Sequence, residues 1–198
     1  MRDCTQFYID GQWVDPVEEN TVAVENPATE ETIGHISFGT CADVDKAVAA
    51  ARRAFESFSQ TSKEERLTLL RAIQAEIETR KEELATAVSD EMGAPLSLAN
   101  GPHVGLLAGH CQKAIEVLEG FAFERLDGPT LHVWEPVGVV GMITPWNWPL
   151  NQIACKVFPA LATGNTMVLK PSEIAPFNAY IFTEIMHAAG VPAGVFNL

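Results

Sequence analysis

One amide side chain lies between two tryptophans and two prolines at residues 144–149, which read TPWNWP. Proline fixes its own φ angle and indole rings fill space, so we expect a stiff loop that holds Asn147 in one place. The Asn147 NH₂ group is a neutral donor that does not titrate near pH 7, and such a donor suits an oxyanion hole. The alternative left open by the sequence is that Asn147 caps a helix that begins at Pro149.

A lysine and a glutamate follow an apolar stretch at residues 170–173, which read KPSE. A carboxylate beyond the second strand of a βαβ unit can accept hydrogen bonds from ribose hydroxyls, and the Lys170 ammonium can donate to the same sugar. The Glu173 charge disfavours a 2′-phosphate, which favours NAD as cofactor and leaves NADP as the second choice. The alternative is an exposed ion pair that contributes less than about 1 kcal/mol to stability.

Both motifs come where a buried strand is predicted to end. Residues 139–144 form a short, continuous apolar run, as expected for a strand covered on both faces, and 166–169 form a second such run. Helices are predicted over 149–164 and 177–189, and a third strand begins at 195–198. This succession predicts an α/β fold with a parallel, right-handed, doubly wound (Rossmann-like) sheet. Ligands of such sheets bind beyond the carboxyl ends of the strands, where both motifs lie.

The N-terminal part of the chain predicts a hairpin and a layer of helices. Residues 7–14 read FYIDGQWV, so Asp10-Gly11 stands between FYI and QWV, and this pair is favoured in tight type I′ turns. Apolar residues recur at three- and four-residue steps over 41–58 and 104–120, which predicts an amphipathic helix in each segment. We expect these apolar stripes to pack in the core and to carry no catalytic group.

Two capping patterns divide the segment between these helices. Ser62 and Glu65 have the spacing of a capping box, which opens a second helix. Thr79 and Glu82 repeat the spacing, so a new helix or a bend is expected to begin with Thr79 as its cap and to run toward Gly93.

Composition excludes several classes of protein. The 198 residues are 47% apolar and 20% charged, an ordinary globular balance, and no apolar run reaches the length of a membrane span. Because 13 Lys and Arg stand against 26 Asp and Glu, the net charge of −13 repels nucleic acid and anionic lipid. We therefore expect no nucleic-acid and no membrane partner. The first residues lack the apolar stretch of a secretory signal, so a cytoplasmic protein is expected.

The four cysteines and five histidines form no metal or disulfide pattern. The cysteines are widely spaced with no CxxC pair, so reduced thiols are expected. Glu184 and His187 have the i, i+3 spacing of a di-iron helix, but no second copy completes such a site. We expect no metal site, and we place the histidines at the surface or at helix caps.

Three stretches of the sequence together resemble the aldehyde dehydrogenase superfamily. They are PVGVVGMITPWNWPL at 136–150, PALATGN at 159–165 and KPSE at 170–173. The resemblance is dense over 130–198 and looser through the N-terminal helices, where NPAT at 26–29 and EMGAP at 91–95 carry it. It covers the whole of this chain, but only the first part, well under half, of a complete family member.

The resemblance implies a chemistry and assigns residues to it. Family members oxidise aldehydes to acids with NAD(P): a cysteine thiolate attacks the aldehyde, hydride passes to nicotinamide, and water releases the thioester. By resemblance, Asn147 is the oxyanion-hole donor, and Lys170 with Glu173 binds the ribose. Lys156 resembles a proton-relay lysine, although a solvated helix lysine is the alternative. The remaining cofactor-binding positions are Ile143, Thr144, Pro145, Trp146 and Ser172. The aldehyde tunnel, which Asn151 and Gln152 would make partly polar, is expected to be lined by Trp148, Asn151, Gln152 and Cys155.

Other parts of the family's catalytic machinery have no counterpart in this chain. The nucleophilic cysteine, the glutamate that activates water and the glycine-rich pyrophosphate turn belong to a later segment, so we expect no turnover from this chain alone. Cys155 is not expected to replace the nucleophile, because it should pack on the inner side of a helix with no neighbour that activates a thiolate. Two alternatives stay open: a relative that forms acyl-CoA or reduces an acyl phosphate, and a non-catalytic chain that binds a nucleotide or another subunit.

The resemblance also divides the chain into three parts. Residues 1–121 would form the hairpin and helices of the cofactor-binding domain, 122–138 an excursion resembling the family's oligomerisation strands, and 139–198 the first βαβαβ part of the NAD-binding sheet. The full-length protein is expected to be a homo-oligomer, a dimer or a tetramer, that acts on an aldehyde. A parallel sheet of two and a half strands would leave an edge bare, so something else must cover it.

Overall fold

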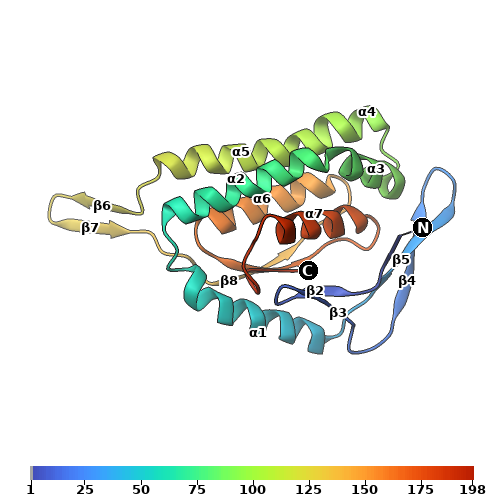
Figure 1. Ribbon diagram of the computed structural model, residues 1–198, viewed down its shortest axis with the longest axis horizontal. Coiled ribbons are helices and arrows are strands. Elements are labelled where there is room, and N and C mark those ends of the chain that lie inside the picture. The colour runs from blue at the N-terminus through green and yellow to red at the C-terminus, as the bar shows by residue number, and fades with distance from the viewer. Residues whose placement is uncertain (1) are drawn as a thin grey trace.

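A computed structural model describes residues 2–198 and shows a small parallel sheet between helices (Figure 1). The sheet has the strand order β10–β9–β8 and is parallel throughout. Helices α6 and α7 lie on one face and α1 on the other, which confirms the predicted doubly wound α/β class. The bounds are β8 (Val139–Ile143), β9 (Thr166–Lys170), β10 (Phe196–Asn197), α1 (Cys41–Phe58), α6 (Pro149–Ala162) and α7 (Phe177–Ala188).

Strand β8 is less buried than its sequence predicts. Met142 joins the core, whereas the side chain of Ile143 is 77% exposed. The expectation that both faces of this strand are covered is therefore wrong. β8 is an edge strand of the sheet, and its successive side chains point to opposite faces. Near the carboxyl end of the strand, the face that carries Met142 is buried and the face that carries Ile143 is exposed.

The remaining helices stack above α6 and α7 (Figure 1). Helix α5 packs against both α2 and α6, so its apolar stripe lies in the core as predicted. The bounds are α2 (Lys63–Thr79), α3 (Lys81–Met92), α4 (Leu96–Leu98), the π-helical turn η1 (Ala99–His103) and α5 (Val104–Gly120). Among residues 2–198, none of the helices is both long and apolar enough to cross a membrane.

One of the two predicted caps is confirmed and the other is wrong. The Ser62 amide donates to Glu65 Oε2 at 2.7 Å, and the Glu65 amide donates to Ser62 Oγ at 3.2 Å, which is a complete capping box. A new helix does begin near Thr79, but Thr79 remains the last residue of α2 and its hydroxyl donates back to the Glu76 carbonyl at 2.8 Å. Arg80 is the residue between the two helices.

The N-terminal strands form two small sheets. Asp10 and Gly11 have φ angles of 55° and 79°, so the predicted type I′ turn joins β2 to β3. A second sheet has the order β1–β5–β4, with β1 parallel to β5. The bounds are β1 (Arg2–Cys4), β2 (Phe7–Ile9), β3 (Gln12–Val14), β4 (Thr21–Asn26) and β5 (Glu31–Ser37).

The first hairpin covers the edge of the parallel sheet beyond β10. The Tyr8 amide donates to the Leu198 carbonyl at 3.1 Å, and the Leu198 amide donates to the Tyr8 carbonyl at 2.8 Å. The Asp10 amide also donates to the side-chain oxygen of Asn197 at 3.0 Å. The edge that the sequence appeared to leave bare is therefore paired with a segment from the other end of the chain.

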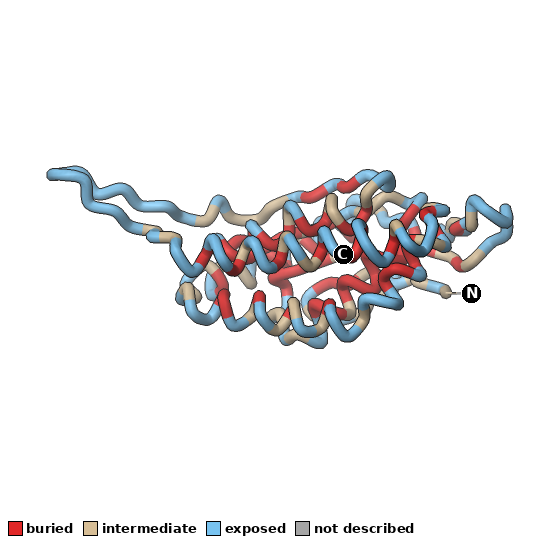
Figure 2. Tube along the Cα trace, turned by 90° about the horizontal axis from the view of Figure 1, so that it is seen from above, coloured by how far each residue is buried: buried red, intermediate tan, exposed pale blue. Residues whose placement is uncertain are grey.

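A second hairpin extends away from the body of the molecule (Figures 1 and 2). It consists of β6 (Glu124–Asp127) and β7 (Thr130–Val133), and every residue of both strands is exposed. Figure 2 shows this arm without a buried segment, in contrast to the helices and the sheet. An isolated two-stranded hairpin is at best marginally stable in water, so this arm is the part of the chain with the least support of its own.

A buried carboxyl group ties α3 to α7. Glu91 is 1% exposed, and it accepts hydrogen bonds from the Asn178 amide at 2.9 Å, from the Phe177 amide and from the Asn178 side chain. The two backbone donors are the otherwise unpaired amides at the start of α7. Burial, opposed by these hydrogen bonds, raises the pKa of Glu91 from 4.5 to about 7.

We predict that Glu91→Gln removes a pH dependence of stability. Between pH 4.5 and 7 the folded chain holds the Glu91 proton more tightly than the unfolded chain, so this group's contribution falls as pH rises. The free energy of unfolding of wild type relative to the Gln variant should fall by on the order of 3 kcal/mol across that range. Urea unfolding of both proteins at several pH values measures it. Glu78→Gln, at an exposed site, is the control, and parallel curves for wild type and Glu91→Gln would contradict the prediction.

Candidate functional site

The two predicted motifs lie side by side at the carboxyl ends of β8 and β9. Ile143 is directly opposite Lys170 in the strand register, and the Thr144 amide donates to the Lys170 carbonyl at 3.2 Å. The pairing thus continues one residue past β8. The loop that carries Asn147 and the loop that carries Glu173 therefore start from adjacent points on one edge of the sheet.

The loop with Asn147 is exposed at its centre and anchored at both ends. Thr144 is 3% exposed, whereas Pro145, Trp146 and Asn147 are exposed. Trp148 is half-buried and is the N-cap residue of α6, so the alternative that Asn147 caps this helix is wrong. Asn147 precedes the cap and is accessible to a ligand.

His103 stacks on the tryptophan that follows Asn147. The rings of His103 and Trp148 are 4.3 Å apart between centroids and 17° from parallel. His103 is 0% exposed, and although it stands at the N-cap position of α5 its side chain makes no capping hydrogen bond, so the expectation of a surface or capping histidine fails for this one side chain. Burial lowers the pKa of His103, so the ring is neutral near pH 7. The only hint of its place in the sequence is Pro102, which is expected to distort a helix.

Lys170 and Glu173 form an exposed ion pair at the end of β9. Lys170 Nζ lies 3.0 Å from Glu173 Oε2, and both side chains are about half exposed, at 60% and 45%. The amide of Glu173 itself and then the Lys170 ammonium hold the pKa of this carboxyl below its usual value, so it is ionised near pH 7. Ser172 Oγ accepts a hydrogen bond from the Ile174 amide at 3.3 Å, which shapes the turn.

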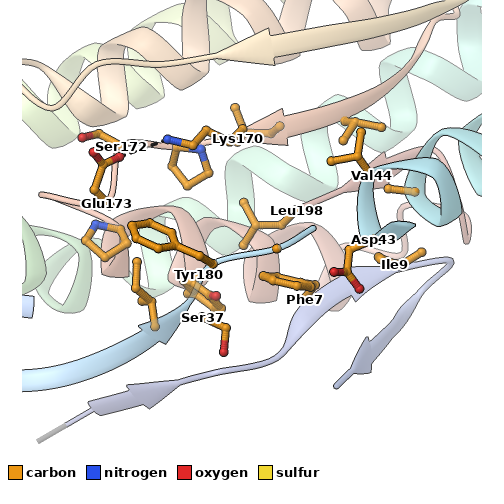
Figure 3. Close-up of a pocket in the computed structure, with 18 residues that line it drawn as sticks. Phe7, Ile9, Ser37, Asp43, Val44, Lys170, Ser172, Glu173, Tyr180 and Leu198 are labelled. Atoms are coloured by element: carbon orange, nitrogen blue, oxygen red, sulfur yellow. Dashed lines mark hydrogen bonds and ion pairs between the residues drawn. The ribbon is translucent and has the colours of Figure 1, made fainter. Parts of the chain in front are cut away.

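A cavity of about 270 Å³ opens beside this ion pair (Figure 3). Lys170, Ser172 and Glu173 lie on one side of it, and Phe7 and Ile9 of the first hairpin lie on another (Figure 3). Its walls are mainly apolar, with a few polar groups at the strand end. This combination of apolar walls and a few grouped polar atoms is typical of a small-molecule site.

The predicted tunnel residues lie at the N-cap and in the first two turns of α6. Asn151 and Gln152 are half-buried, and Asn151 Oδ1 lies 2.9 Å from Nε2 of His110 on α5. His110 was not predicted, because its sequence position is only a flank of the apolar stripe of its helix. It extends the polar strip expected from Asn151 and Gln152 onto a second helix.

Cys155 and Lys156 lie farther along the same helix. Cys155 is exposed, so the expectation that it packs on the inner side is wrong; that side is taken by Ile153, Ala154 and Val157. Lys156 Nζ lies 3.1 Å from both the backbone oxygen and Oε1 of Gln152, and 3.7 Å from Cys155 Sγ. The structure therefore brings Lys156 to Gln152, a predicted tunnel residue, and not to the Asn147 loop.

The described residues contain no cluster suited to a metal ion. Among residues 2–198, no group of three or more His, Cys, Asp and Glu side chains could hold one. Glu184 instead pairs with Arg2 at 3.0 Å and with Arg80 at 2.5 Å, and Nδ1 of His187 lies 2.9 Å from the Tyr8 hydroxyl.

The sequence of this chain is similar to those of known proteins. The family model described as "Aldehyde dehydrogenase family" matches residues 13–198. A 3-succinoylsemialdehyde-pyridine dehydrogenase of a Pseudomonas species is 55% identical over the whole chain, which covers 42% of that protein. A putative aldehyde dehydrogenase of Staphylococcus aureus is 49% identical with the same coverage.

Solved structures give the same result. A Bartonella henselae aldehyde dehydrogenase superimposes with a TM-score of 0.98 at 42% identity, over 100% of this chain and 42% of that one. A mutant aldehyde dehydrogenase C of Pseudomonas syringae, in complex with NAD+ and octanal, has a TM-score of 0.97 and 50% identity over 98% of this chain and 40% of its own. The chain thus spans about two fifths of the length of these relatives.

Proposed function

The chain belongs to the aldehyde dehydrogenase family, and from this we propose that it is the N-terminal part of an NAD-dependent enzyme that oxidises an aldehyde to a carboxylic acid. The observation that carries the proposal is the pairing of Thr144 with Lys170. It joins a loop that offers a neutral amide donor to a loop that offers a lysine–carboxylate pair. Oxidation of an aldehyde by a dinucleotide needs both groups at one place.

The cofactor role falls to the residues at the strand ends. Lys170 and Glu173 form an exposed ion pair, and such a pair fits the hydroxyls of a ribose. The cavity beside them provides apolar walls for part of the dinucleotide. When bound, the nicotinamide group supplies a hydride acceptor. Further contacts to the cofactor would come from Ser172 and from the neighbouring segment Ile143, Thr144, Pro145 and Trp146.

Asn147 would act on the substrate. Its side-chain NH₂ donates to the aldehyde oxygen, which gains negative charge when a thiolate attacks the carbonyl carbon. The donor is useful only if it is already in place, because a group that reorients during the reaction loses part of the gain. The nucleophile itself would come from a segment outside this chain, so the activity is proposed for the whole subunit.

The aldehyde would approach along the first turns of α6. Trp148, Asn151, Gln152 and Cys155 lie there, and the half-buried amides support a partly polar tunnel. Among the relatives, one is named for a pyridine-bearing semialdehyde and one was solved with octanal. Lys156 would relay protons at the tunnel wall, and its hydrogen bond to Gln152 supports that place.

The exposed hairpin would join subunits of a homo-oligomer. Apolar side chains on and beside it are left in solvent, namely Leu126, Leu131, Val133, Trp134 and Val137. Apolar surface of this extent on an unsupported arm indicates an interface. We further propose a cytoplasmic enzyme, which accords with four cysteines that are all free thiols.

We predict that Asn147→Ala in the full-length enzyme lowers kcat by about 10²–10³-fold, because one oxyanion-hole donor is lost. The KM for NAD should change little, since Asn147 is not part of the ribose-binding pair. Steady-state kinetics with saturating NAD measures both constants. A variant that keeps more than about a tenth of the wild-type kcat would contradict the proposed role.

We predict that Glu173→Gln shifts cofactor use toward NADP. The substitution removes the charge that repels a 2′-phosphate and keeps a hydrogen-bonding side chain of the same size. The ratio of kcat/KM for NADP to that for NAD should rise at least about tenfold, which corresponds to about 1.4 kcal/mol of differential binding. Asp45→Asn, an exposed substitution on α1, serves as control. An unchanged ratio would contradict the ribose-binding role.

We predict that Leu126→Asp with Leu131→Asp weakens the oligomer. The two leucines face each other across the hairpin register, and both are exposed, so the subunit fold should not change. Sedimentation equilibrium of the full-length protein should show the variant shifted toward smaller species. His132→Ala, on the opposite face of the same hairpin, is the control, and an unshifted double variant would contradict the interface.

A further inference from the structure

We propose that His103 is a positioning residue whose stack on Trp148 holds the loop that presents Asn147. The catalytic role of Asn147 rests on the proposed function. The proposal that His103 fixes the position of the loop does not depend on it. The two rings are nearly parallel, with centroids 4.3 Å apart, and Trp148 is the residue directly after Asn147. Fixing the indole therefore fixes the backbone on one side of the amide.

The loop has few other anchors. Its backbone hydrogen bonds are at its ends, where the Thr144 amide donates to the Lys170 carbonyl and the Gln152 amide donates to the Trp148 carbonyl at 2.9 Å. Within the described chain, residues 145–148 make no side-chain hydrogen bond or ion pair, so nothing of that kind holds the indole. Trp148 also lacks helical backbone angles, with φ −142° and ψ 63°. The direction in which the chain enters α6 thus depends on how this side chain packs.

His103 is held firmly by its own element. It is the last residue of η1, a π-helical turn that contains Pro102 and packs against α3, α5 and α6. A π-turn inserts an extra residue into a helix, and such turns often occur where a side chain must be re-aimed for function. Here the turn leads directly into α5 and places the imidazole against the start of α6.

The chemistry of His103 also indicates a role for its flat face. Neither ring nitrogen has a hydrogen-bond partner within the described chain, although the side chain is fully buried. Buried polar groups without partners are rare, and each one calls for an explanation other than stability. A neutral imidazole offers the same flat surface to an indole as a phenyl ring does, and the stack is the specific contact that this side chain makes.

The experiment compares three substitutions in this chain by hydrogen exchange of the Thr144 and Gln152 amides, which are the hydrogen-bonded ends of the loop. His103→Ala removes the stack and should speed this exchange roughly tenfold or more, because the loop opens locally more often. His103→Phe keeps a flat ring and should exchange within a factor of about three of wild type. Leu107→Ala is the matched control: it makes a cavity in the buried face of α5 and should lower Tm without speeding exchange in the loop.

Trp148→Leu tests the stack from the other side and covers the case in which His103→Ala does not fold. It should speed exchange of the same amides as His103→Ala does, and adding His103→Ala to it should have no further effect. Equal exchange in His103→Ala and Leu107→Ala, or fast exchange in His103→Phe, would overturn the proposal.

Kinetics of the full-length enzyme separate this inference from the proposed function. His103→Ala should lower kcat with little change in the KM for NAD, and His103→Phe should restore most of it. If His103→Ala speeds exchange in the loop but leaves kcat unchanged, the proposal that His103 positions the loop stands. The role of Asn147 as oxyanion donor is then contradicted. A loss of kcat in Leu107→Ala equal to that in His103→Ala would overturn the proposal.

Discussion

The register between β8 and β9 is the constraint on which the candidate site depends. Because Ile143 is opposite Lys170, both loops leave the sheet at the same level, and the Thr144 amide extends the pairing by one bond. A shift of one residue would turn every side chain of the strand to the other face of the sheet. Asn147 and Glu173 would then be presented from different depths, and the two groups that define the chemistry would no longer share an edge.

That register is held from both ends of the chain. On one side, the first hairpin pairs with β10 through Tyr8 and Leu198, so the earliest strands close the sheet formed by the latest. On the other side, Glu91 of the helical layer satisfies the first amides of α7, which connects β9 to β10. The residues before 122 thus carry no side chain that is proposed to take part in the reaction. They do fix the position of β8 and β9, which carry the loops with the proposed side chains.

Local patterns in the sequence predicted most elements of this fold but not how deeply each is buried. The type I′ turn at Asp10, the capping box at Ser62 and the parallel strand order all follow from short-range chemistry or chain direction, which a sequence displays. Apart from the Thr79 cap, the main errors concern how deeply side chains are buried. Cys155 is exposed because the core side of α6 is already filled, and His103 is buried because a π-turn aims it at another helix. The 3.6-residue period in fact places Cys155 on the opposite side of α6 from Ile153, Ala154 and Val157, whereas it carries no information on His103.

The side chains proposed to act on substrate and cofactor are exposed, whereas the side chains that stabilise the fold are buried. The proposed chemistry and the stability of the chain can therefore change separately. Exposed ion pairs such as Lys170–Glu173 contribute little to folding, and Asn147 is exposed, so evolution can change these side chains with small effect on the fold. His103 shares features with both the exposed site residues and the buried core residues. It is buried like a core residue, but its unpaired nitrogens weaken the core that it occupies, and its contact is with the loop. An apolar ring there would keep the stack on Trp148 and remove the unpaired nitrogens, so the stack accounts for a flat ring at this position and not for its nitrogens.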